Sequence, residues 1–221
     1  MVPGGKLGAY TGTRPEVRML VPRGARRVLD LGCATGAIGA ALKSERPLEV
    51  VGVEASPSFA AEARSRLDRV VEADLEELLA DSDPGIGRFD CLLAADVLEH
   101  LRDPAAALAA AVRLLEPGGV AIVSLPNVRF FETFWELGVR GRWPRRDFGL
   151  FDRTHLRWFT RRDAWELLET AGLEVTDVQP LIRIRPIGSR FDGWFAWLGR
   201  TPLSEFFALQ YLFAGRKPGD S

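Results

Sequence analysis

Three acidic residues come at the ends of short apolar runs in the first third of the chain. Asp30 lies in Val-Leu-Asp-Leu, Glu54 ends Val-Val-Gly-Val-Glu, and Asp74 ends Val-Val-Glu-Ala-Asp. If these runs are strands of a parallel sheet, their carboxyl ends lie where α/β proteins bind ligands. A carboxylate in the position of Glu54 can accept hydrogen bonds from both hydroxyls of a ribose. We favour that role over a strand-end acid that is only solvated.

A glycine turn follows the first of these runs. Gly32 and Gly36 flank Cys33, and residues 37–42 have the composition of a helix. Glycine has no Cβ, so a ligand can approach the backbone closely, and the first helical N–H groups have no partner within the helix. The turn therefore predicts a ligand site built from backbone, although such a corner alone is a weak signal. An aspartate before the first glycine, and Ala34 at the third position, argue against a nicotinamide-dinucleotide fingerprint.

The chain contains two histidines, and both are candidates for proton transfer. The pKa of an imidazole lies close to working pH, which suits a general base. His155 is the stronger candidate, and the alternative is that it only anchors its own segment through hydrogen bonds. His100 follows an apolar strand in a short connection, where a histidine more often has a structural role.

Arginines are concentrated between residues 140 and 162. A solvated surface is the commonest explanation of such a run. The functional alternative is an anionic acceptor, such as a sugar phosphate or nucleotide sugar, held by Arg153 and Arg157. Asn127 is a further candidate substrate-binding residue. We expect no metal site.

Strands and helices alternate along most of the chain and must position these residues. We expect strands at 28–31, 48–54, 70–74, 89–96 and 120–125, separated by helices at 37–42, 56–67, 75–80 and 103–115. A helix at 161–171 and two strands at 173–178 and 204–217 follow. This alternation predicts an α/β fold with helices on both faces of a parallel sheet.

Four features in this order resemble the class I S-adenosylmethionine-dependent methyltransferases. They are Val-Leu-Asp-Leu-Gly-Cys-Ala-Thr-Gly at 28–36, Glu54, Asp-Val-Leu-Glu-His at 96–100 and Leu-Glu-Pro-Gly-Gly at 115–119. Ala34 stands where the family pattern has glycine. The chain is similar to 3-demethylubiquinone-type methyltransferases, and residues 149–160 resemble methyltransferases associated with glycan and cell-envelope biosynthesis. The resemblance implies a doubly wound, Rossmann-like sheet of seven strands, mostly parallel, with an antiparallel last strand.

The resemblance also implies the cofactor S-adenosyl-L-methionine and the product S-adenosyl-L-homocysteine. Asp74 falls where the family places an acid near the adenine amino group, although it could also cap the next helix. The implied cofactor contacts are Tyr10, Arg14, Asp30, Gly32, Cys33, Gly36, Glu54, Ala55, Asp74, Leu75, Ala95 and Asp96. For Tyr10 and Arg14 the alternative is that they only dock the N-terminal helix.

The implied activity is methyl transfer to an oxygen of a small molecule, such as a sugar, a glycan precursor or another secondary metabolite. Alternatives are methylation of nitrogen, carbon or a carboxylate, a non-catalytic domain that binds the cofactor, and a dehydrogenase. We expect a single domain over 1–221, with a lead-in at 1–27, a cofactor-binding core at 28–125 and a lid over the acceptor site at 126–160. A C-terminal part at 161–221 includes an aromatic insert at 181–204.

The composition of the chain limits the classes of partner that we expect it to bind. The formal net charge of -1 gives no positive field for nucleic acid. Two cysteines do not make a disulfide framework, and the sequence shows neither a signal peptide nor a transmembrane run, so we expect a cytoplasmic location. The aromatic stripe from Phe191 to Leu198 suggests core packing or a homodimer seam, with contact to a membrane surface or a lipid-linked acceptor as the minority alternative.

Overall fold

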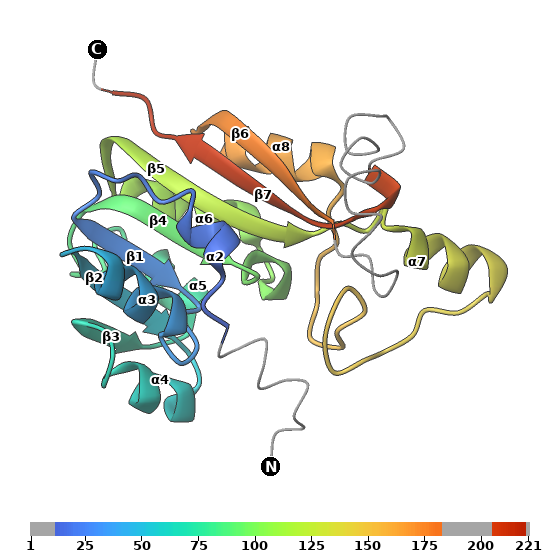
Figure 1. Ribbon diagram of the computed structural model, residues 1–221, viewed down its shortest axis with the longest axis horizontal. Coiled ribbons are helices and arrows are strands. Elements are labelled where there is room, and N and C mark those ends of the chain that lie inside the picture. The colour runs from blue at the N-terminus through green and yellow to red at the C-terminus, as the bar shows by residue number, and fades with distance from the viewer. Residues whose placement is uncertain (1–11, 183–204, 220–221) are drawn as a thin grey trace.

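The computed structural model describes residues 12–182 and 205–219. Within them, seven strands form one sheet in the order β3-β2-β1-β4-β5-β7-β6 (Figure 1). The strands are β1 (Arg27–Leu31), β2 (Glu49–Glu54), β3 (Arg69–Glu72), β4 (Phe89–Ala95), β5 (Leu115–Pro126), β6 (Glu174–Ile182) and β7 (Ala208–Arg216). The first five are parallel to one another, and β7 is antiparallel to β5 and β6. The predicted fold class is therefore confirmed.

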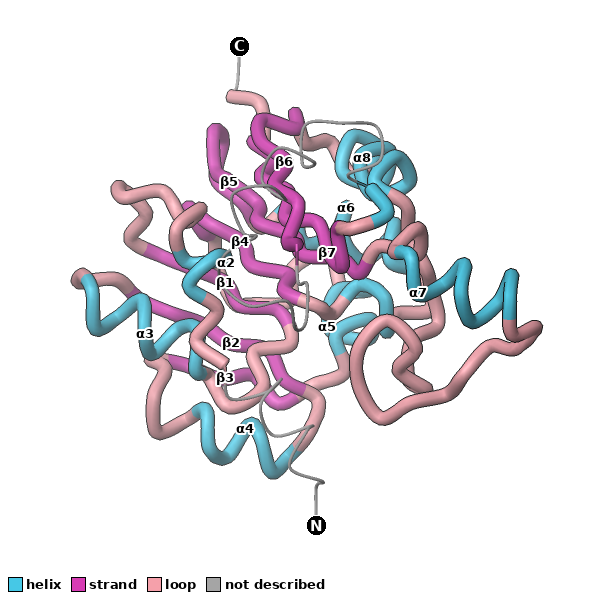
Figure 2. The backbone as a smooth tube through the Cα atoms, turned by 45° about the vertical axis from the view of Figure 1, so that its right-hand side comes forward, coloured by secondary structure: helices cyan, strands magenta, loops and turns pink. Residues whose placement is uncertain are grey.

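Helices cover both faces of this sheet (Figure 2). The helices are α2 (Pro15–Arg18), α3 (Ala37–Glu45), α4 (Pro57–Ala63), α5 (Leu75–Ala80), η1 (Leu98–His100), α6 (Pro104–Arg113), α7 (Phe131–Thr133), η2 (Phe134–Val139) and α8 (Arg161–Thr170). Residues of α2, α3 and α4 share one apolar cluster with the sheet, while α5, α6 and α8 share another. Within the described residues, none of the helices has the length and apolar composition needed to cross a bilayer.

Alternation along the central strands explains why the sheet is buried on both faces. In β1, Val28 packs with the α2–α4 cluster, whereas Leu29 packs with the opposite one. In β4, Cys91 and Leu92 divide between the two clusters in the same way. Successive side chains of a strand point to opposite faces, so a strand covered on both sides must be apolar throughout.

Several element bounds differ from the sequence prediction. β5 begins at Leu115 rather than 120, because Leu115 already pairs with Phe89 of β4 before the register shifts across the Pro-Gly-Gly stretch. α4 ends at Ala63 rather than 67. Residues 131–139 of the predicted lid form α7 and a π-helix, η2, where the sequence shows no clear period. Tyr10 and the stripe from Phe191 to Leu198 lie outside the described residues.

Gly52 lies where two elements approach β2 closely, and its replacement is a test of this packing. A Cβ at this position would lie 2.5 Å from Sγ of Cys33 and 2.8 Å from Cδ1 of Leu67. Overpacking of this kind costs roughly 1–3 kcal/mol. We expect Gly52→Ala to lower the free energy of unfolding by about 1–2 kcal/mol in urea titrations. Gly24→Ala is the control, because a Cβ at Gly24 would meet nothing within 4 Å, and equal losses in both variants would contradict the close approach.

Candidate active site

A cavity of about 540 Å³ opens at the carboxyl ends of β1, β2 and β4. One end is lined by the glycine turn, the end of β2 and the start of α5. The other end is lined by η1 and by residues 147–155 of the predicted lid. Among the described residues of its wall, six are acidic and one, Arg14, is basic. The cavity therefore has a negative potential that favours a cationic ligand.

Glu54 connects the first two strands at this cavity. Its Oε2 accepts a hydrogen bond of 2.9 Å from the backbone N–H of Ala34, and its Oε1 accepts one of 2.8 Å from that of Ser56. Glu54 thus holds the glycine turn against the end of β2 while its side chain lines the cavity. Asp74 lines the same end and also caps α5, accepting from the N–H groups of Glu76 and Glu77.

Three non-glycine residues in the described part of the chain have a left-handed backbone, and all of them line the cavity. They are Arg14, Ala34 and Asp96, with φ angles of 41°, 47° and 57°. This conformation costs a residue other than glycine roughly 1–2 kcal/mol. Backbone strain of this kind concentrates at functional sites. Ala34 therefore adopts in this turn a backbone conformation that glycine adopts without strain.

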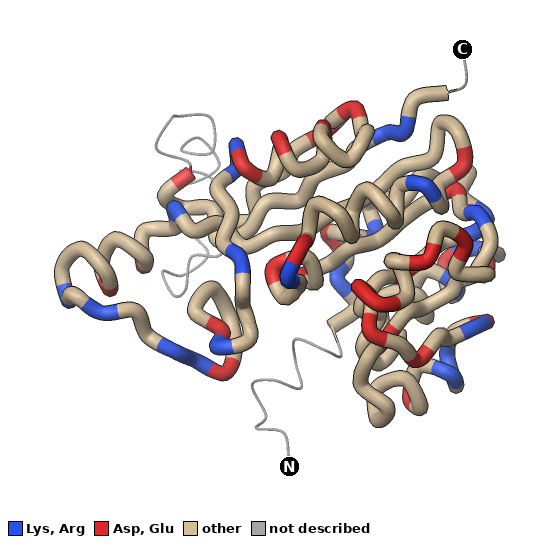
Figure 3. The backbone as a smooth tube through the Cα atoms, turned by 180° about the vertical axis from the view of Figure 1, so that it is seen from behind, with Lys and Arg blue, Asp and Glu red and all other residues tan. Residues whose placement is uncertain are grey.

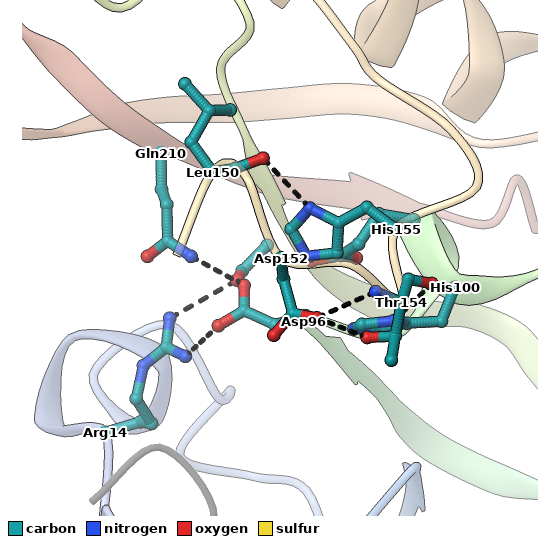
Figure 4. A network of polar contacts seen from close by, with 10 residues as sticks. Arg14, Asp96, His100, Leu150, Asp152, Thr154, His155 and Gln210 are labelled. Carbon is teal, nitrogen blue, oxygen red and sulfur yellow. Dashed lines mark hydrogen bonds and ion pairs between the residues drawn. The ribbon is translucent and has the colours of Figure 1, made fainter. Parts of the chain in front are cut away.

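Asp96 is the centre of a polar network at the end of β4 (Figure 4). Its carboxylate accepts hydrogen bonds from the guanidinium of Arg14, the hydroxyl of Ser124 and the amide of Gln210, the last at 2.8 Å. Arg14 also pairs with Glu16 at 2.6 Å. The segment before α2 is thereby tied to β4, β5 and β7, and it forms one wall of the cavity.

The two histidines lie together beside this network (Figure 4), with ring centroids 4.8 Å apart. The contact between Nδ1 of His155 and the carbonyl oxygen of Leu150 is 3.2 Å. A carbonyl only accepts, so this Nδ1 carries the hydrogen and Nε2 of the neutral ring carries the lone pair. That Nε2 lies 3.9 Å from Oε1 of Glu99.

Hydrogen bonds between the predicted lid and η1 create this arrangement. The carbonyl oxygen of Glu99 accepts from the backbone N–H groups of Leu156 and Arg157, at 2.8 and 3.1 Å. Nδ1 of His100 lies 3.2 Å from the carbonyl oxygen of Thr154. These contacts join residues more than fifty positions apart and bring His155 against Glu99.

Burial shifts the pKa of the ionisable groups in this region. Burial, followed by the nearby charge of Asp96, raises the pKa of Glu99 well above its usual range. Burial and the neighbouring His100 lower the pKa of His155, so its neutral form is favoured. Burial also raises the pKa of Cys33, which argues against a reactive thiolate in the cavity. Both cysteines of the chain are free.

Comparison with known proteins decides the family. The family described as Methyltransferase domain matches residues 11–178. The chain belongs to this family. A probable S-adenosylmethionine-dependent methyltransferase of Mycolicibacterium smegmatis is 36% identical over 155 residues, which cover 69% of this chain and 53% of that protein. The ubiquinone biosynthesis O-methyltransferase of Xylella fastidiosa is 28% identical over 204 residues, covering 90% of this chain and 76% of that one.

The methyltransferase also resembles solved structures over nearly its whole length. A possible histamine N-methyltransferase of Thermotoga maritima matches with a TM-score of 0.64 and 23% identity, covering 95% of this chain and 89% of that one. Magnesium protoporphyrin IX methyltransferase of Synechocystis, with bound S-adenosylhomocysteine, matches with a TM-score of 0.64 and 16% identity, covering 96% and 84%. At this identity the likeness shows the fold.

The family confirms the resemblance to class I S-adenosylmethionine-dependent methyltransferases and the cofactor predicted with it. This family assignment replaces the alternative of a nicotinamide-dependent dehydrogenase. The first curated relatives are longer proteins, of which the matched segments span only 42% and 53%.

Most of the predicted cofactor contacts of the methyltransferase line the cavity. These are Arg14, Gly32, Cys33, Glu54, Ala55, Asp74, Leu75, Ala95 and Asp96. Asp30 does not line it, because its side chain is buried behind the turn and is only 1% exposed. Gly36 is the N-cap of α3, where a Cβ would lie 3.0 Å from Leu67, so it shapes the turn from behind.

Both predicted catalytic histidines line the cavity, but the three predicted substrate-binding residues do not. Asn127 is 1% exposed and its amide donates to the carbonyl oxygens of Glu205 and Ala208, so it anchors the start of β7. Arg153 pairs with Asp147 at 2.8 Å on the surface. Arg157 donates to the carbonyl oxygens of Leu156 and Arg102.

Four arginines of the run pair with acids of the same segment, in which basic and acidic positions alternate along the backbone (Figure 3). Arg140 and Arg142 pair with Glu136, and Arg146 pairs with Glu132. These pairs hold the lid segment together, and the anionic acceptor stays a prediction that these contacts do not support.

Sequence reasoning missed Glu99 and Gln210, which both line the cavity. Glu99 is part of the Asp-Val-Leu-Glu-His motif, so the sequence does indicate its place near the site. The motif does not indicate that its carboxyl group lies beside His155. Gln210 lies in an apolar strand that is 114 residues from its partner Asp96, and no local pattern points to it.

Proposed function

We propose that this methyltransferase moves the methyl group of S-adenosylmethionine to a hydroxyl oxygen of a small molecule. The acceptor oxygen forms a bond to the methyl carbon as the carbon–sulfur bond breaks. The sulfonium becomes the neutral thioether of S-adenosylhomocysteine, and the hydroxyl proton is released. The protein then has to align the reactants and accept the proton, and alignment alone can contribute roughly 7–11 kcal/mol.

One observation carries this proposal: a single cavity joins the turn held by Glu54 to the histidine pair at its other end. The negative wall suits a cationic sulfonium donor. Asp74 and Glu54 lie at the end where the family binds the nucleoside, which leaves the methyl group directed toward η1 and the lid. Names of relatives such as ubiquinone biosynthesis O-methyltransferase further support an oxygen acceptor.

The acceptor end combines apolar walls with a proton-accepting group. Phe148, Leu150 and Leu209 line it together with the histidines. Such walls suit an acceptor with an apolar face, and the lone pair on Nε2 of His155 suits the acceptor hydroxyl. We assign His155 as the catalytic residue and His100 as its neighbour that favours the neutral form.

The proposal is tested in two steps with the purified chain. Calorimetric titration with S-adenosylhomocysteine measures cofactor binding, for which we expect one site per chain. A screen of phenols, sugars and glycan precursors, with amines and carboxylates as further arms, then measures S-adenosylhomocysteine release. Binding without turnover on any arm favours the non-catalytic alternative. The absence of any binding contradicts the proposed function.

Glu54→Gln tests the cofactor end separately. The amide nitrogen cannot accept a hydrogen bond, so one of the N–H groups of Ala34 and Ser56 loses its partner, and the charge facing the ribose is also lost. Hydrogen bonds to charged groups contribute roughly 1.5–3 kcal/mol, so we expect the Kd for S-adenosylhomocysteine to rise about 10- to 100-fold.

Glu72→Gln is the matched control for this variant. Glu72 ends the neighbouring strand β3 and pairs with Arg64 on the surface, outside the cavity. Its replacement should leave the Kd unchanged. A folded Glu54→Gln protein with the original Kd would show that Glu54 does not contact the cofactor.

A further inference from the structure

Glu99, His100 and His155 form a cluster of three side chains, each of which can bind a metal ion. One possible ligand atom from each side chain lies within 4.8 Å of the other two. All three residues line the acceptor end of the cavity. An ion with bonds of about 2.1 Å spans at most about 4.2 Å between opposite ligands, so small side-chain rotations would close the cluster around one ion.

Both imidazoles have Nε2 as the ring nitrogen that is available to bind a metal ion. Nδ1 of His155 donates to the carbonyl oxygen of Leu150, and Nδ1 of His100 donates to that of Thr154 (Figure 4). The lone pair of each neutral ring is therefore on Nε2. Histidines that bind metal characteristically donate their other ring nitrogen to a carbonyl or carboxylate, which fixes the tautomer and the ring orientation.

Glu99 supplies an independent observation. Glu99 is only 1% exposed, and its Oε2 has no hydrogen-bond partner among the described residues. A buried carboxylate without partners is costly unless it is paired or binds a metal. The nearest positively charged side chain of the cavity, Arg14, already pairs with Asp96 and Glu16. A cation at the cluster would satisfy Glu99.

We propose that Glu99, His100 and His155 together bind one divalent transition-metal cation of the zinc type at the acceptor end of the cavity. Two imidazole nitrogens and one carboxylate oxygen suit such an ion, whereas Mg²⁺ and Ca²⁺ prefer oxygen ligands. The neighbouring carboxylates of Asp96 and Asp152 line the same part of the cavity and add negative charge.

The role of the cation deepens the proposed function and rests on it. Three protein ligands leave at least one coordination position open, and all three of these residues line the cavity from which an acceptor would enter. The acceptor oxygen binds there, and the cation stabilises the oxygen after its proton passes to water. The oxygen then bonds to the methyl carbon while the carbon–sulfur bond breaks, and the cation itself is unchanged. The methyl transfer and its site stay as proposed above, but the role of His155 is revised: its Nε2 binds the cation, and water takes the proton.

Metal binding is tested on chain purified without a polyhistidine tag and dialysed against a chelator. Equilibrium dialysis with Zn²⁺ alone, followed by elemental analysis, gives the stoichiometry and Kd. The chain has two histidines, so ¹⁵N-histidine NMR reports this cluster alone. We expect one ion per chain and shifts of Nε2 in both imidazoles.

Variants identify the ligands. Glu99→Gln, His100→Gln and His155→Gln should each raise the Kd for Zn²⁺ at least 10-fold. Glu166→Gln is the control, because Glu166 pairs with Arg162 on the surface of α8 and should leave the Kd unchanged. Circular dichroism and thermal unfolding of each variant confirm that it is folded. A variant that fails to fold is replaced by the wild-type NMR readout, which needs no substitution.

The outcomes separate this inference from the proposed function. No Zn²⁺ binding at 100 μM (about -5.5 kcal/mol by the standard conversion), or binding without a shift of either imidazole, overturns the metal site. If the metal-free chain still binds S-adenosylhomocysteine and transfers methyl groups at full rate, the cation has no catalytic role and His155 remains the base. Loss of S-adenosylhomocysteine binding by the wild-type chain overturns the proposed function, whatever the metal result.

Discussion

Replacing His155 with glutamine is expected to lower kcat by a factor of about 10² to 10⁴, the range typical of a lost acid–base group. Glutamine keeps a polar side chain but has no basic nitrogen. His155 reaches the cavity with Nε2 while Nδ1 is held by the carbonyl oxygen of Leu150. The imidazole is required whether it accepts the proton itself or holds a cation that stabilises the oxygen.

Steady-state rates of S-adenosylhomocysteine release, with the acceptor identified by the screen, measure this effect. The KM for S-adenosylmethionine should stay within a factor of about two, because His155 lies at the other end of the cavity from Glu54. Leu156→Ala is the control, since Leu156 is exposed and does not line the cavity. Full activity of the His155 variant at neutral pH would remove the histidine from the mechanism.

Asp30→Asn is expected to change the pH dependence of stability. Burial, followed by the charge of Glu54, raises the pKa of Asp30 to about 7. In the unfolded chain an aspartate has a pKa of about 3.9. Between these values the folded protein holds a proton that the unfolded chain has released, so the free energy of unfolding falls as the pH rises through this window. Below about pH 4 and above about pH 7 this contribution is constant.

Urea titrations at pH 5 and pH 8 test this prediction. From linkage, Asp30 should make the wild-type chain about 2.5 kcal/mol less stable at pH 8 than at pH 5, and Asp30→Asn should lose this part of the change. Other groups titrate equally in both proteins and cancel in the comparison. Asp177→Asn, at an exposed position in β6, is the control. The same pH dependence in wild type and Asp30→Asn would show that Asp30 is ionised in the folded protein.

The cofactor end of the cavity could be predicted because its residues are set by short stretches of chain. Gly32 and Ala34 follow β1 directly, and Glu54 ends the next parallel strand in register with it. Within one strand–helix–strand unit the handedness and the strand alternation leave little freedom, so strand-end residues fall at the same edge. Asp30 does not line the cavity, because its side chain is directed into the interior and is only 1% exposed.

The acceptor end could not be predicted from local pattern. Asn127 was read as a substrate contact, but its amide satisfies the carbonyl oxygens of Glu205 and Ala208, which are about eighty residues away. Arg153 pairs with Asp147, and Arg157 donates to the carbonyl oxygens of Leu156 and Arg102, so neither lines the cavity. These contacts depend on how residues 126–160 pack against the rest of the chain. That segment has no regular hydrophobic periodicity from which its packing could be predicted.

The order of strands and helices, the glycine turn and the acids of the cofactor end can all be derived from the residues along the chain. These follow from hydrophobic period, turn chemistry and the geometry of parallel strands, all of which act over neighbouring residues. The proximity of Glu99, His100 and His155, in contrast, arises only in the folded chain. Their proximity requires residues 154–157 to hydrogen-bond to η1 across more than fifty positions, and long-range packing of that kind is settled only when the whole chain is folded.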